Sequence, residues 1–160
     1  MFSRGALLGV LTLLIAGCGF QLRGAATVPA EMSRTYIEAS DRRSLFYRRM
    51  RDSLQDAGVA VVESPLDATA TFSVLADETG QRVLSVSARN VPTEFEVFYT
   101  VAYQVATEQE TLLDTRTQTL TRDYTWDETR VLGKEKEGEL LREAIVDDLV
   151  RVVLIQLSGI

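Results

Sequence analysis

The sequence lacks most of the residues that carry enzyme chemistry. Its 160 residues include no histidine, one cysteine and one tryptophan. Histidine is the commonest general base and the commonest metal ligand, so its absence removes both roles at once. Neither a Gly-x-Ser-x-Gly motif nor a glycine-rich phosphate loop occurs. The sequence therefore predicts no catalytic residue, no metal site and no cofactor, and we expect that the protein is not an enzyme.

Pairs of acidic residues leave one enzymatic alternative. Glu94 and Glu96 lie two residues apart, and Asp147 and Asp148 are adjacent. Because two carboxylates suffice for a glycosidase, a cell-wall or sugar hydrolase stays a minor hypothesis. A single tryptophan offers little surface for stacking on sugars. Solvated faces of a strand and of a helix explain the two pairs more simply.

The first eighteen residues have the plan of a bacterial export signal. Arg4 supplies a positive start, residues 6–16 are apolar and uncharged, and small residues lead to Cys18. This apolar stretch is shorter than the roughly 20 residues of a transmembrane helix. Ile15-Ala16-Gly17-Cys18 resembles the lipobox, where a diacylglycerol is attached to the thiol before cleavage. We predict a signal peptide over residues 1–17 and a lipidated Cys18; the alternative is an uncleaved anchor with an unrelated cysteine.

The mature chain is expected to fold without covalent support. Cleavage after residue 17 leaves 143 of the 160 residues, enough to bury a sizeable core. No cysteine remains for a disulfide, so packing alone has to hold the fold in an oxidising compartment. Loss of Arg4 leaves 16 basic and 23 acidic residues, a net charge of −7. Such a chain is not expected to bind nucleic acid, although local basic sites for an anionic lipid stay compatible with it.

The segment after Cys18 has no clear periodicity until residue 35. We interpret residues 18–34 as the lipidated N-terminus and a tether, followed by one domain over residues 35–160. A strand is predicted over residues 35–39, and Ser40 and Asp41 are expected to cap a helix. Gly58 is expected to end that helix. A short strand over residues 59–63 and a turn over residues 64–67 follow.

The apolar periodicity changes to two between residues 68 and 126. It predicts strands over residues 71–75, 83–88, 95–105 and 112–126, with turns over residues 77–80 and 108–110 and a break over residues 90–92. Short connections favour antiparallel pairing. A final helix over residues 134–157 carries an apolar stripe. The predicted fold is an α+β two-layer sandwich, in which two helices pack on one face of a mostly antiparallel sheet of four strands or slightly more.

The residues at the lipid site carry a family resemblance. Cys18-Gly19-Phe20-Gln21-Leu22-Arg23-Gly24 resembles the mature N-terminus of the lipopolysaccharide-assembly lipoprotein family LptE. The resemblance implies a binding protein without catalysis, anchored by its lipid on the periplasmic side of the outer membrane. It also implies a plug inside the LptD β-barrel, which helps that barrel to assemble and to deliver lipopolysaccharide to the cell surface. Gly19, directly after the lipidated cysteine, is compatible with sorting to the outer membrane.

The same resemblance implies two lipopolysaccharide-binding residues. Family members are associated with an arginine before the long central strand and a lysine ahead of the final helix, and Arg89 and Lys134 match these positions. Lipid A carries phosphates, which arginine binds bidentately and lysine binds as a point charge. The alternative is that both are ordinary exposed loop cations.

Other features leave their roles open. A second basic cluster lies on the first predicted helix and either faces phosphates or an acidic partner or forms a solvated surface; it contains Arg42, Arg43, Arg48, Arg49 and Arg51. Tyr124 and Trp126 either close the core or contact an acyl chain or a barrel wall. A lipid-anchored periplasmic binding or chaperone-like domain without a barrel partner is the main alternative function.

Overall fold

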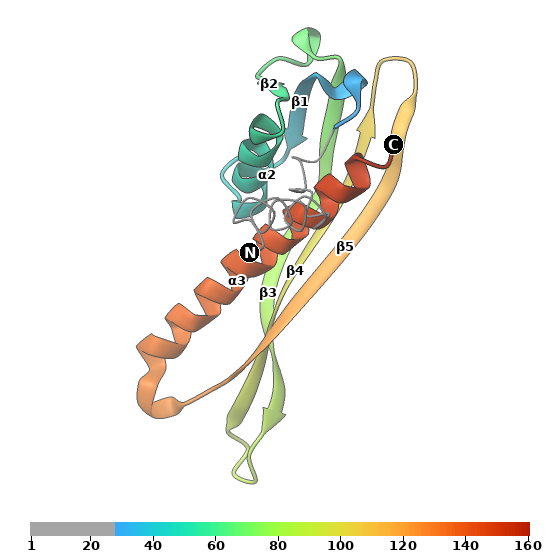
Figure 1. Ribbon diagram of the computed structural model, residues 1–160. Coiled ribbons are helices and arrows are strands. Elements are labelled where there is room, and N and C mark those ends of the chain that lie inside the picture. Colours follow the sequence, from blue (N-terminus) through green and yellow to red (C-terminus); the bar gives the residue numbers. More distant parts are fainter. Residues whose placement is uncertain (1–27) are drawn as a thin grey trace, which may run out of the picture.

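The structure, a computed structural model, describes residues 28–160. The predicted signal peptide, Cys18 and the heptad of residues 18–24 lie outside this part of the chain. The described residues form five strands, two α-helices and three 3-10 helices (Figure 1). The strands are β1 (Arg34–Ala39), β2 (Ala60–Val62), β3 (Ala70–Val86), β4 (Pro92–Ala106) and β5 (Thr111–Thr125). The helices are η1 (Ala30–Met32), α2 (Leu45–Asp56), η2 (Pro65–Asp67), η3 (Glu128–Arg130) and α3 (Val131–Leu157).

The five strands form one mixed sheet in the order β2-β1-β3-β4-β5. β3, β4 and β5 make an antiparallel meander, whereas β1 pairs in parallel with both β2 and β3. A parallel pair needs a crossover between its strands, and α2 supplies the one from β1 to β2. The two helices pack on one face of the sheet (Figure 1). The predicted α+β sandwich is confirmed, with the strand number slightly above four.

The core lies between this face and the helices. The predicted alternation in β4 is confirmed, because Val97, Tyr99, Val101, Tyr103 and Val105 are all buried. α2 and α3 contribute the other half of the core through their apolar faces, which include Phe46, Met50, Leu54, Ile145, Leu149 and Val153. No helix among the described residues has both the length and the apolar character that crossing a membrane requires.

The predicted break in the third strand is wrong. Residues 77–80 form no turn, and β3 runs without interruption over 17 residues. The Asp-Glu-Thr-Gly signal is overridden by pairing with β4, where Gly80 lies opposite Phe98. A Cβ on Gly80 would come within 2.7 Å of Phe98 Cζ, so the aromatic ring occupies the space that the glycine leaves. A register shift between Val74 and Ala76 bends the strand instead.

Three element boundaries also differ from the predictions. α2 is capped by Ser44 rather than by Ser40 or Asp41, since Ser44 Oγ accepts a hydrogen bond from Tyr47 N at 3.0 Å. Gly58 ends the helix as predicted, with a φ of 87°. Met32 is fully buried, so the end of the predicted tether belongs to the packed fold. α3 begins at residue 131, three residues before the predicted start.

Candidate functional site

Both predicted lipopolysaccharide-binding residues lie at the same end of the molecule. We call this region the distal end: it comprises the β3–β4 turn (residues 87–91), the β5–η3 junction (residues 126–130) and the first turns of α3. In Figure 1 it lies at the bottom, where the β3–β4 hairpin extends beyond the helices and α3 begins. Arg89 lies in the turn, whereas Lys134 lies inside α3 and not in a loop ahead of it.

The β3–β4 turn presents Arg89 on an ordered backbone. Ser87 N donates to Val91 O at 2.8 Å, and Asn90 N donates to Ser87 O at 2.9 Å. Asn90 adopts the left-handed conformation with a φ of 60°, which asparagine tolerates better than most residues. Arg89 is exposed, and its guanidinium pairs with no carboxylate among the described residues. Its full charge is therefore available to a ligand.

A hollow of about 280 Å³ separates the turn from the β5–η3 junction. Trp126 N donates to Thr93 O at 2.8 Å, which holds the two segments together. The lining consists of Ser87, Arg89, Val91, Pro92, Thr93, Trp126, Asp127, Glu128 and Thr129. Lys134 does not line this hollow, and no hydrogen bond joins it to Arg89 within the described chain. The structure therefore places the two cations at one end without joining them in one site.

Lys134 already has a partner. Its Nζ lies 2.8 Å from Glu137 Oε2, one helical turn further along α3, and its side chain is 19% exposed. The hydroxyl of Tyr124 lies beneath this part of α3, because a Cβ on Gly138 would come within 3.5 Å of it. Burial raises the pKa of Tyr124, and the negative charge of Glu137 raises it further. Lys134 thus stands in a partly buried, charged environment.

Three aromatic rings form a cluster, and one of them, Trp126, lines the hollow. Phe95 stacks on Tyr124 with ring centroids 5.9 Å apart and meets Trp126 edge-on at 5.3 Å. Tyr124 is buried and Trp126 partly so, which places both in the core packing that was the simpler expectation. Trp126 also lines the hollow, so it packs in the core and contributes to the hollow surface.

Sequence reasoning missed the second wall of the hollow. Asp127 Oδ1 accepts hydrogen bonds from Thr129 N at 2.9 Å and from Thr129 Oγ1 at 2.7 Å, which caps η3. These two hydrogen bonds lower the pKa of Asp127. In the sequence, residues 126–129 stand out only as the polar segment that follows the last strand. They come to lie across the hollow from Arg89 because β5 pairs with β4.

The acidic pairs that suggested a hydrolase are engaged in other contacts. Glu96 pairs with Arg82 and is 12% exposed, while Glu94 accepts from Ser85 Oγ at 2.8 Å. Asp147 pairs with Arg49, and Asp148 pairs with Arg122 and Arg151. Neither pair lines the distal hollow. The geometry therefore gives these carboxylates structural roles.

The basic cluster, which spans α2 and the residues just before it, is largely neutralised within the fold. Arg42 and Arg51 both pair with Glu63, at 3.2 and 3.0 Å, and Arg49 pairs with Asp147 at 3.2 Å. Arg42 also lies over the ring of Tyr36. Arg43 and Arg48 remain exposed without a carboxylate partner among the described residues. The cluster thus offers a ligand fewer free charges than its sequence indicates.

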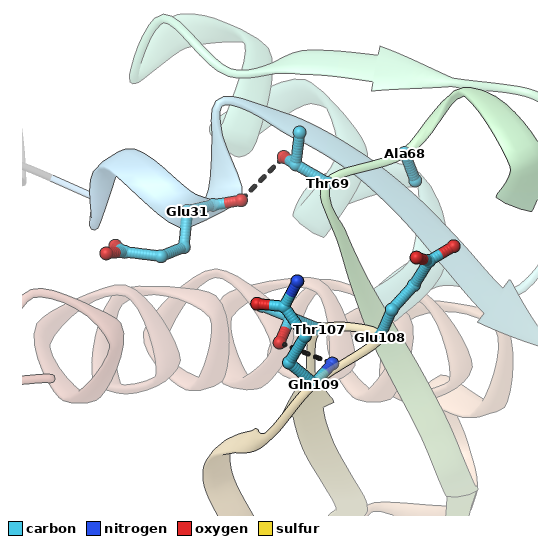
Figure 2. A pocket seen from close by; sticks show the side chains of 6 residues that line it. All are labelled: Glu31, Ala68, Thr69, Thr107, Glu108 and Gln109. Atoms are coloured by element: carbon cyan, nitrogen blue, oxygen red, sulfur yellow. Dashed lines mark hydrogen bonds between the residues drawn. The ribbon is translucent and has the colours of Figure 1, made fainter.

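A second hollow, of about 330 Å³, lies at the opposite end of the sheet and is lined by Glu31, Ala68, Thr69, Thr107, Glu108 and Gln109 (Figure 2). The carboxylates of Glu31 and Glu108 point away from each other. Thr69 and Thr107 form hydrogen bonds with lining residues of their own hollow. No group of three metal-ligating side chains occurs within residues 28–160. This hollow shows no convergent chemistry.

The fold is shared with solved bacterial lipoproteins. Lipoprotein B from Nitrosomonas europaea gives a TM-score of 0.72 at 26% identity, covering 88% of this chain and 91% of that one. Rare lipoprotein B from Shewanella oneidensis gives a TM-score of 0.68 at 23% identity, covering 79% of this chain and 94% of that one. The class is therefore an α+β domain of the kind found in small lipoproteins.

Sequence comparisons narrow this class to one family. The LPS-assembly lipoprotein LptE from Yersinia enterocolitica is 30% identical over 155 residues, covering 93% of this chain and 74% of that protein. The LptE family model, described as lipopolysaccharide-assembly, matches residues 32–157. The chain belongs to the LptE family, as the heptad predicted. The match spans nearly the whole described fold, including Arg89 and Lys134.

Proposed function

We propose that this chain is an outer-membrane lipoprotein that works in the transport of lipopolysaccharide to the cell surface. It would be anchored on the periplasmic side through a lipid on Cys18, plug an LptD-type β-barrel and assist its assembly, and bind lipopolysaccharide without catalysing a reaction. The observation that carries the proposal is the LptE family match over residues 32–157. The absence of histidine and the engagement of the acidic pairs agree with a protein that acts by binding.

The open face of the sheet supports the role of a plug. Opposite the helices, β5 presents Thr117, Thr119 and Thr121, and the Oγ1 atoms of Thr100 and Thr119 lie 2.9 Å apart. The lumen of a large outer-membrane barrel is polar, so a plug needs a hydrogen-bonding exterior of this kind. Other protein surfaces share this property, and for that reason the family match carries more weight.

The distal end supports direct lipopolysaccharide binding. Arg89 is exposed and unpaired among the described residues, and an arginine binds a phosphate through two parallel hydrogen bonds. Lys134 adds a second cation at the same end, although it has to exchange Glu137 for the ligand. We assign Arg89 the larger share of the binding energy for this reason.

The partner is tested by isolating the tagged full-length lipoprotein from gently solubilised outer membranes. Samples run unboiled and boiled should show one large heat-modifiable β-barrel in near one-to-one ratio. Recovery of the lipoprotein alone, in detergents that keep other outer-membrane complexes intact, would reject the plug. A lipid-anchored binding domain without a barrel partner would then be the better description.

The binding residues are tested with point variants. Replacing Arg89 by glutamine removes a charge-assisted contact worth about 1.5–3 kcal/mol, so lipopolysaccharide affinity should fall roughly 10- to 100-fold. Arg43→Gln is the matched control, because Arg43 is also an exposed arginine without a carboxylate partner in the described chain. Equal losses in the two variants would mean that binding follows net charge and not position.

A further inference from the structure

The two halves of α3 are held in the fold by different means. All of the buried side chains of the helix belong to its second half: Ile145, Val146, Leu149, Val150, Val153 and Leu157. Within residues 131–144, which we call the strap, the only buried residue is Gly138, and Leu141 is partly buried. In Figure 1 the strap extends to the left of the strands, whereas the later turns of α3 cross the sheet. Apolar burial therefore fixes the second half of the helix and leaves the strap to other contacts.

The polar contacts of the strap are few and mostly internal. Its two ion pairs, each between a lysine and the glutamate three residues later, stay within the helix. Among the described residues one side-chain hydrogen bond joins the strap to the sheet, from Arg142 Nε to Thr79 Oγ1 at 3.1 Å. Gly138 lies against the hydroxyl of Tyr124. By contrast, two aspartates of the second half pair with arginines of α2 and β5.

The sequence of the strap also weakens its helix. Gly133 and Gly138 both lie within it, and glycine favours a helix less than alanine does. Arg130, the N-cap residue, makes no side-chain capping bond, and the first turn carries no acidic residue. Neither a cap nor a favourable charge therefore stabilises the start of the helix. A helical segment of this length is marginal in water without packing, so the strap depends on its few contacts with the sheet.

Both ends of the strap are anchored. Ahead of it, Trp126 N donates to Thr93 O at 2.8 Å, and Asp127 caps η3. After it, Ile145 is fully buried. Because the strap lies between two fixed points, it has little freedom to swing out as a rigid helix. Unwinding is the motion that the anchors permit.

We infer that the strap is a separate opening unit: residues 131–144 unwind from the sheet and re-form while residues 145–157 and the sheet stay folded. Opening breaks the bond between Arg142 and Thr79 and uncovers the hydroxyl of Tyr124. This device lets one end of the domain change its outline without global unfolding. It goes beyond the proposed function and does not depend on it, although a plug that enters a barrel would profit from such an adjustable end.

Hydrogen exchange of backbone amides tests the inference on the full-length lipoprotein in detergent. The first four amides of α3 lack an acceptor within the helix, so the comparison uses residues 135–144 and 149–157. Exchange is followed under conditions in which its rate reports the equilibrium between closed and open states. We expect residues 135–144 to exchange at least about 100-fold faster than residues 149–157.

Two arginines of α3 provide a variant and its matched control. Arg142→Gln removes the hydrogen bond to Thr79 and should speed exchange in the strap roughly three- to tenfold. Arg151→Gln makes the same chemical change in the second half, where Arg151 pairs with Asp148 of the same helix. It should leave exchange in the strap unchanged.

Two glycines provide variants with the opposite effect. A Cβ on Gly138 would lie 3.5 Å from the Tyr124 hydroxyl, which is an ordinary contact, so Gly138→Ala fits. It should slow exchange in the strap about fivefold through its higher helix propensity. A Cβ on Gly133 would meet nothing within 4 Å. Gly133→Ala should therefore also slow exchange, through helix propensity alone.

Four outcomes would overturn the inference. Equal protection of residues 135–144 and 149–157 would mean that α3 opens as one unit, as would an equal effect of Arg142→Gln on both halves. Equal acceleration of the strap by Arg142→Gln and Arg151→Gln would mean that exchange follows charge and not docking. If neither glycine variant slowed exchange, unwinding would be rejected. None of these results bears on the isolation of a barrel partner, which tests the proposed function separately.

Discussion

The pair of Lys134 and Glu137 provides a sharp test of whether Lys134 binds phosphate. Glu137 Oε2 lies 2.8 Å from Lys134 Nζ, so it competes with any anionic ligand for this ammonium. Replacing Glu137 by glutamine keeps the size of the side chain but removes the negative charge. The variant should therefore bind lipopolysaccharide more tightly than the wild type. If Lys134 had only a structural role, the affinity would not increase.

The size of the gain follows from the geometry. A phosphate held by Lys134 would lie about 6 Å from the Glu137 carboxylate, where two unit charges repel by about 0.7 kcal/mol in bulk water. Removing this repulsion should raise the affinity roughly threefold, and more where the site is shielded from water. Loss of the ion pair should cost at most about 0.5 kcal/mol of helix stability, which leaves the fold intact. The gain should shrink with added salt.

α3 itself contains the matched control. Lys136 pairs with Glu139 at the same spacing, with Nζ and Oε2 2.9 Å apart, and both side chains are well exposed. Glu139→Gln changes the net charge identically but frees a lysine that we do not assign to the site. Affinities are compared by calorimetry at two ionic strengths. An equal gain in both variants, or a loss in Glu137→Gln, would refute the role of Lys134.

Three further predictions concern the scaffold and are checked by equilibrium unfolding. Asp77 accepts a hydrogen bond from the buried hydroxyl of Tyr99 at 2.6 Å. Asp77→Ala should therefore lower the free energy of unfolding by about 2–3 kcal/mol. A smaller loss than that caused by Tyr99→Phe would contradict this prediction. Gly80→Val should destabilise the sheet, because its Cβ meets Phe98 at 2.7 Å, and adding Phe98→Ala should recover part of the loss. Burial raises the pKa of Tyr103 from 10.0 to about 12. The stability that this shift supplies is therefore complete below pH 10 and lost as the pH rises toward 12. Tyr103→Phe should weaken this dependence without removing it, because the raised pKa of Tyr124 acts in the same direction.

The central strand was predictable because its pattern is local. In β4 every second side chain between Val97 and Val105 faces the helices, and the alternation appears directly in the sequence. In β3 the local signal and the fold disagree. Asp77 to Gly80 reads as a turn, yet Asp77 is directed toward α2 and bonds Ser44 Oγ, while Gly80 makes room for Phe98. These partners come from other elements, so no local pattern contains them.

In the candidate site, too, some features follow from the local sequence and others depend on distant elements. Arg89 and Lys134 were assigned through a family resemblance that residue types alone do not supply. The hollow was not predicted, because it needs residues 87–93 and 126–129 to meet, and this follows from the register in which Glu94 lies opposite Thr125. Lys134 stays outside the hollow because it lies in the first turn of α3, beyond η3.

The arrangement of the two ends gives the proposed function a geometry. Val28, the first described residue, lies close in sequence to Glu31, which lines the hollow beside Thr107 at one end of β4. Pro92, at the other end of β4, lines the hollow that contains Arg89. A strand of 15 residues spans about 50 Å. A lipid anchor attached ahead of residue 28 would thus enter the fold about one β4 length from Arg89. The chain would then enter the fold near one end of β4, and the proposed ligand would bind near the other.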